Sequence, residues 1–141
     1  MHLTIVGAGR VGRALGKLLH DRGWRIGAVI TRSPGTARKA VRAIGAGVPR
    51  ARITADALAA DVILVTTPDS RIAEAAAALA ACARDAEAVS SGDKRPLRGK
   101  VVLHTCGALD SRVLAPLKKL GAATGSLHPF QTFGDRAIPN L

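Results

Sequence analysis

Short apolar runs recur along the chain, and the segments between them have a different apolar spacing. The clearest runs are residues 3–6, which end at Gly7, and residues 62–65. Continuous runs of this length are typical of strands that are buried on both faces of a parallel sheet. We predict strands at 3–6, 26–30, 53–54, 62–65, 101–103 and 124–127.

The segments between these runs carry apolar residues at helical spacing. Val11, Ala14, Leu15, Leu18 and Leu19 fall on one helical face, and the glycine at 23 is expected to end that helix. Further helices are expected from about 36 to 44, from the turn at 66–69 to about 83, and from about 110 to 121. A proline at 116 should kink or weaken the last of these. We expect a short helical turn at 56–60 and a loop at 84–99.

Strands that alternate with helices imply right-handed βαβ units and a parallel sheet covered on both faces. Six strands in about 130 residues fit a three-layer α/β Rossmann fold with strand order 3-2-1-4-5-6. We therefore expect residues 1–141 to form a single dinucleotide-binding domain. Ligands of such sheets bind beyond the carboxyl ends of the strands, near the switch between strands 1 and 4.

A glycine-rich turn joins the first strand to the first helix and matches the pattern GxGxxG. This pattern is informative because it follows a strand and opens an amphipathic helix. The first glycine permits the tight turn, the second lets the backbone approach a pyrophosphate, and the third allows close packing of helix and strand. The alternative is a glycine-rich turn without a ligand. The residues predicted to bind the cofactor here are Gly7, Ala8, Gly9, Arg10, Val11 and Gly12.

The end of the second strand should decide which cofactor is bound. An NAD site usually has an acidic residue there for the ribose 2′-hydroxyl. This chain has Thr31, Arg32 and Ser33, and no acid lies between Asp21 and Asp56. A guanidinium and hydroxyls suit a 2′-phosphate, so we expect NADP(H) to be favoured over NAD(H). Alternatively, Arg32 is an ordinary solvated loop arginine.

Three segments together resemble a known group: GAGRVGRALG at the start, VTTPDSRI after the fourth predicted strand, and HTCGALDSRVLAPLKKLGAATGSLHPFQTF near the end. Residues 2–133 resemble the N-terminal Rossmann-like domain of bacterial oxidoreductases of unassigned substrate. The wider clan is similar to pyrroline-5-carboxylate reductase, 6-phosphogluconate and β-hydroxyacid dehydrogenases, and prephenate dehydrogenase. The resemblance implies hydride transfer to or from a small molecule, and cofactor contacts by Thr66, Thr67 and Pro68.

The clan continues into a helical domain that dimerises and closes the substrate cleft, whereas this sequence ends at Leu141. We therefore expect a domain that binds cofactor and turns over little by itself. Phe130 and Phe133 are expected to form the seam on which the helical domain docks, or through which the chain self-associates.

Two histidines follow the fifth and sixth predicted strands. Histidine titrates near neutral pH, so His104 and His128 are candidate catalytic acid–base groups. His128 stands in a His-Pro turn that resembles the one bordering the substrate in prephenate dehydrogenase-like domains. The alternative for each is a structural histidine bonded to loop backbone. We interpret Cys106 as a packing residue rather than a nucleophile.

Composition narrows the remaining possibilities. Apolar residues make up 48% and charged residues 22%, so the chain should fold as a globular protein, and its apolar stretch at 75–83 is too short to span a bilayer. We expect a cytoplasmic protein without a signal peptide. The two cysteines provide neither a disulfide framework nor a zinc site, and no metal is expected.

The net charge of +11 is concentrated in one half, because residues 1–52 carry +10 and the rest +1. This pattern indicates an anionic partner, such as a phosphorylated cofactor, or a compositional bias towards arginine. Nucleic acid is not expected, since aromatic stacking residues are lacking. The competing function is a nucleotide-sensing regulatory module without catalysis, although such modules typically carry an acid after the second strand.

Overall fold

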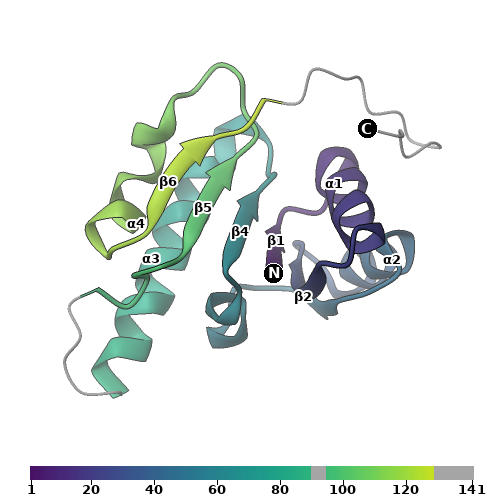
Figure 1. Ribbon diagram of the computed structural model, residues 1–141, viewed down its shortest axis with the longest axis horizontal. Coiled ribbons are helices and arrows are strands. Elements are labelled where there is room, and N and C mark those ends of the chain that lie inside the picture. The colour runs from purple at the N-terminus through teal and green to yellow at the C-terminus, as the bar shows by residue number, and fades with distance from the viewer. Residues whose placement is uncertain (90–94, 129–141) are drawn as a thin grey trace.

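The computed structural model describes residues 1–89 and 95–128. Its centre is a parallel sheet of order β3-β2-β1-β4-β5-β6, which confirms the predicted topology (Figure 1). The strands are β1 (His2–Val6), β2 (Arg25–Ile30), β3 (Val48–Arg50), β4 (Val62–Val65), β5 (Val101–His104) and β6 (Ala123–Ser126).

Helices cover both faces of the sheet, as expected for the three-layer fold (Figure 1). Helices α1 (Arg10–Asp21) and α2 (Pro34–Ile44) pack together on one face. Helices α3 (Ile72–Val89) and α4 (Ala115–Lys119) pack together on the other. Three 3-10 helices complete the described elements: η1 (Ala55–Ala59), η2 (Asp69–Arg71) and η3 (Ser111–Leu114).

The central strands divide their side chains between two apolar clusters. Leu3 and Ile5 of β1 belong to the cluster under α1 and α2, whereas Val6 belongs to the cluster under α3. This alternation follows from the two-residue period of a strand. Thr4 is a polar residue that is fully buried, and its hydroxyl donates to the carbonyl of Ala57 at 2.8 Å.

The predicted third strand at 53–54 is wrong, because β3 is Val48–Arg50. This strand pairs only with β2, so it lies at the edge of the sheet. Pro49, which cannot donate a backbone hydrogen bond, is tolerated at an edge, and Val48 remains 42% exposed. The apolar-run criterion finds buried central strands and misses an edge strand of this kind.

Two other boundaries differ from the expectation. Helix α3 continues to Val89 instead of ending near 83, because its alanine-rich sequence favours helix over the predicted loop. The segment around Pro116 begins as a 3-10 helix, and the proline then lies in the first turn of the short α4. A proline is tolerated at that position, where no helical donor is required.

None of the helices within residues 1–89 and 95–128 is long and apolar enough to cross a lipid bilayer.

Candidate functional site

The turn between β1 and α1 requires glycine at its first position. Gly7 has φ = +86°, a conformation that other residues rarely adopt, and its N–H donates to the carbonyl of Ile30 at 2.8 Å. A Cβ at this position would lie 2.5 Å from Cγ2 of Thr67. The turn is therefore packed directly against the end of β4.

Gly12 is required for packing. A Cβ there would lie 2.5 Å from Oγ1 of Thr66 and 3.2 Å from Cγ2 of Ile5. The first turn of α1 can approach β1 and β4 this closely only without a side chain.

Gly9 differs from both, because a Cβ there would meet no atom within 4 Å. It is the N-cap of α1, it offers no side-chain cap, and the first turn of this helix has no acidic residue. By contrast, Ser33 caps α2, and its Oγ accepts the N–H of Thr36 at 3.2 Å. No side chain therefore caps the first turn of α1, and a helix N-terminus of this kind favours a solvent molecule or an anionic ligand.

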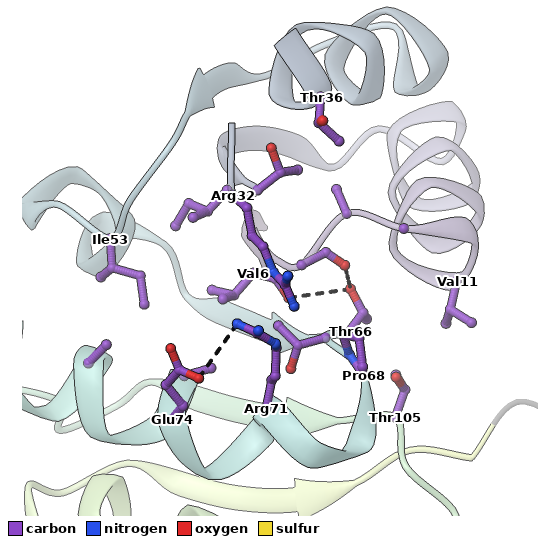
Figure 2. A pocket seen from close by; sticks show the side chains of 18 of the residues that line it. Val6, Val11, Arg32, Thr36, Ile53, Thr66, Pro68, Arg71, Glu74 and Thr105 are labelled. Carbon is purple, nitrogen blue, oxygen red and sulfur yellow. Dashed lines mark hydrogen bonds and ion pairs between the residues drawn. The ribbon is translucent and has the colours of Figure 1, made fainter. Parts of the chain in front are cut away.

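A cavity of about 800 Å³ opens beside this turn at the carboxyl ends of the strands (Figure 2). It contains most of the cofactor residues predicted from the sequence: Gly7, Ala8, Gly9, Arg10, Val11, Thr31, Arg32, Thr66, Thr67 and Pro68. Gly12 and Ser33 are not in its lining. Their positions have local explanations, since Gly12 packs on Thr66 and Ser33 caps α2.

Other residues of the lining were not foreseen. Arg52 and Ile53 come from the segment after β3, a strand that lies at 48–50 and not at the predicted 53–54. A correct β3 would have placed both at the carboxyl end of a strand. Arg71 enters from the end of η2, Glu74 from the first turn of α3, and Thr105 from the residue after β5. Their side-chain directions depend on the packing of α3, which no local sequence signal gives.

The cavity is rich in positive charge. Arg10, Arg32, Arg52 and Arg71 line it, against two carboxylates, those of Asp69 and Glu74. Arg71 and Glu74 form an ion pair of 3.7 Å. The side chain of Arg32 has no hydrogen bond or ion pair with the part of the chain that the structure describes. An excess of cations in a concave site favours an anionic ligand.

The two threonines that follow β4 have different surroundings. Thr66 is buried, and its hydroxyl donates to the carbonyl of Gly7 at 2.7 Å (Figure 2). Oγ1 of Thr67 is also buried, and it has no hydrogen-bond partner among the described residues. Such an orphaned hydroxyl beside the glycine turn is a group that a bound ligand or water could satisfy.

The two candidate catalytic histidines both lie outside the cavity lining. His104 is fully buried, and its Nδ1 accepts the N–H of Cys106 at 3.2 Å. Nε2 must then carry the ring proton, which it donates to the carbonyl of Asp110 at 2.9 Å. This geometry matches the structural alternative stated above, and Cys106 is buried as a packing residue should be.

His128 is exposed, and its ring occupies the space beside Gly107, where a Cβ would lie 2.6 Å from Cε1. Its catalytic role stays a prediction. Phe130 and Phe133, the predicted docking seam, lie outside the described residues. Across residues 1–89 and 95–128, no three His, Cys, Asp or Glu side chains gather as a metal site would require.

Parts of several longer proteins of solved structure have a similar fold. A candidate NADP oxidoreductase from Bacteroides fragilis is 22% identical, has a TM-score of 0.66, and is matched over 94% of this chain and 45% of its own. An imine reductase variant from Myxococcus stipitatus in complex with NAD+ is 23% identical, with a TM-score of 0.59, over 89% and 39%. The Synechocystis arogenate dehydrogenase is 20% identical, with a TM-score of 0.61, over 85% and 37%.

The chain thus spans less than half the length of these three proteins. No curated protein matches its sequence. A profile of the Rossmann-like domain matches residues 1–129, and the chain belongs to that family.

Proposed function

We propose that residues 1–141 are the dinucleotide-binding domain of an oxidoreductase that uses NADP(H). The observation that carries this proposal is the glycine turn, which opens onto the cation-lined cavity at the carboxyl edge of the sheet. The open space above Gly9 and the N-terminus of α1, which has no side-chain cap, suit a pyrophosphate.

The lining also divides into two ends that suit the two halves of such a cofactor. Arg32 and Ile53 lie at the end formed by β2 and β3, where the adenosine half would bind. Thr66, Pro68 and Thr105 lie at the end formed by β4 and β5, where the nicotinamide half would pass. The bound nicotinamide would supply hydride exchange, while the protein orients it and excludes water.

The preference for NADP(H) rests on Arg32 and Arg52, which line the adenosine end of the cavity. The two carboxylates of the lining, those of Asp69 and Glu74, come from the segment after β4, and Glu74 is paired with Arg71. A ribose 2′-hydroxyl would find no carboxylate acceptor at the end of β2, whereas a 2′-phosphate would find guanidinium donors. The same absence of an acid disfavours the nucleotide-sensing alternative, which expects one there.

The structural neighbours support an oxidoreductase over a sensor, since their names include an NADP oxidoreductase, an imine reductase and an arogenate dehydrogenase. The substrate is a small molecule whose pocket is completed by a further helical domain or a second copy of the chain. His128 is the exposed candidate for the acid–base group. The basic half of the chain serves the cofactor rather than a nucleic acid.

Two matched glycine variants test the proposal. Neither Gly9 nor Gly35 has any atom within 4 Å of an added Cβ, so Gly9→Ala and Gly35→Ala should both fold. Only Gly9 lines the cavity. We expect Gly9→Ala to weaken NADPH binding by about tenfold or more, because its methyl group takes the space of the pyrophosphate. Gly35→Ala should leave the affinity unchanged.

Binding is measured by titration of NADPH and NADH fluorescence, and folding by thermal denaturation. The proposal fails if the wild-type chain binds neither cofactor, or if Gly9→Ala binds both as tightly as the wild type does.

A further inference from the structure

Two arginines enter the cavity from opposite walls. Arg32 follows β2, and Arg71 ends η2 at the start of α3; both side chains extend into the same cavity (Figure 2). They come from opposite faces of the sheet and from segments that the chain separates by α2, β3 and β4. Only Arg32 belongs to the segment in which a 2′-phosphate contact is expected from sequence.

Both guanidiniums have N–H donors that make no hydrogen bond with a described residue. Arg32 pairs with no described residue, and Arg71 meets a single carboxylate, that of Glu74, at 3.7 Å. That distance is too long for a good hydrogen bond. The Glu74 side chain is 73% exposed and that of Arg71 is 41% exposed, so their pairing is weak and can exchange.

An anion between the two arginines would relieve their mutual repulsion. A guanidinium presents five donors in a planar fork that matches phosphate oxygens, and two forks from opposite sides could bind one phosphate group. Ile53 and Ala75 also line the cavity and offer apolar surface for a flat ring attached to that group.

We infer that Arg71 is a second arginine for the cofactor 2′-phosphate, closing on it from the end of η2 while Arg32 binds it from the turn after β2. Glu74 competes with the phosphate for Arg71 and thereby lowers the preference for NADP(H). This assignment rests on the proposed function. It adds Arg71 and Glu74, which lie on other elements than Arg32, as residues that determine the preference between the two cofactors.

Arg71 has two other possible roles, and each has its own binding signature. If it stacks on the adenine ring, its removal weakens NADPH and NADH equally, because both contain adenine. If it only stabilises the start of α3 through the i,i+3 pair with Glu74, its removal changes neither affinity.

The first test compares Arg71→Gln with Arg84→Gln. Arg84 lies on α3, is exposed and does not line the cavity, so it controls for the loss of one positive charge. We expect Arg71→Gln to weaken NADPH by about tenfold and NADH by less than twofold, since only NADPH carries the 2′-phosphate. Arg84→Gln should change neither by more than twofold.

The second test removes the competitor. Glu74→Gln should tighten NADPH two- to threefold, as expected for release from a half-exposed ion pair, and leave NADH unchanged. In the Arg71→Gln background the same change should have no effect, because Glu74 acts through Arg71.

Equal losses for both cofactors, or no loss for either, in Arg71→Gln would overturn the assignment. In both cases the wild type still binds the cofactors, so the proposed function survives. Failure of the wild type to bind either cofactor removes the proposed function, and this assignment with it.

Discussion

The hydroxyl of Thr66 donates to the carbonyl oxygen of Gly7 at 2.7 Å, and this bond joins the end of β4 to the glycine turn after β1. Both residues line the cavity, and Thr66 Oγ1 is also the atom against which Gly12 packs. One buried side chain therefore positions two of the three fingerprint glycines at the centre of the sheet.

Thr66→Val should lower the free energy of unfolding by about 1 kcal/mol, because valine keeps the shape but removes one of the two hydrogen bonds to the Gly7 carbonyl, which then accepts only from the N–H of Gly9. The measurement is chemical denaturation at neutral pH. Thr124→Val is the control, since Thr124 is a half-buried threonine of β6 without a side-chain bond to any described residue. A loss no greater than in the control would show that the bond contributes nothing.

His104 should matter for stability. His104→Leu removes both the acceptor of the Cys106 N–H and the donor to the Asp110 carbonyl, so we expect a loss of about 2–3 kcal/mol. His104→Asn keeps an oxygen near the position of Nδ1 and should recover part of that loss. Thermal denaturation of the three proteins measures this order. If His104→Leu were as stable as the wild type, the ring would not hold this loop.

Asp56 should make stability depend on acid pH. Partial burial raises the pKa of its carboxyl, but hydrogen bonds from Thr54 and Arg50 and the charge of Arg50 outweigh that effect and hold the pKa below its usual value. A lowered pKa in the folded state stabilises above the unfolded value of about 4, and this contribution is lost as the pH falls through the folded value.

Asp56→Asn should therefore be less stable than the wild type at pH 7, and the difference should shrink as the pH falls from 4 towards 3. Since Arg50 and Asp56 are each about 40% exposed, solvent screens their pair, and the difference at pH 7 should be only about 0.5 kcal/mol. Urea denaturation at the two pH values measures it, with the exposed Asp85→Asn as the control. A difference that persists unchanged at pH 3 would contradict the assignment.

The sequence predicted the centre of the sheet and the glycine turn because local rules govern both. Buried strands such as β4 are continuous apolar runs, and Gly7 has a backbone conformation that selects glycine. The sequence did not predict edge strand β3, because burial does not constrain the residues of an edge strand. For the same reason it did not place Arg52 and Ile53 in the candidate site.

The directions of the side chains were the second feature that the sequence did not predict. Arg71 and Glu74 enter the cavity because the start of α3 packs on β2 and β4 in one apolar cluster, which is a tertiary relationship. For His104 a usable signal existed: it stands two residues after Val102 in β5, so the strand period places both on the same buried face.

Arg32→Asp tests whether Arg32 is responsible for the preference for NADP(H) over NAD(H). The change replaces a phosphate donor by a carboxylate that would accept a bond from a ribose 2′-hydroxyl and repel a 2′-phosphate. We expect NADPH to bind about thirtyfold more weakly or worse, while the affinity for NADH stays within threefold of the wild-type value or increases.

Arg38→Asp is the control. It makes the same charge reversal on the exposed face of α2, outside the cavity, and should reduce both affinities only slightly. Titration of both cofactors at two salt concentrations separates the contact from the general field, since screening weakens only the latter strongly. A wild-type chain that binds NADH as tightly as NADPH, or an Arg32→Asp chain that loses both equally, would assign Arg32 to the solvated loop surface and remove the 2′-phosphate site.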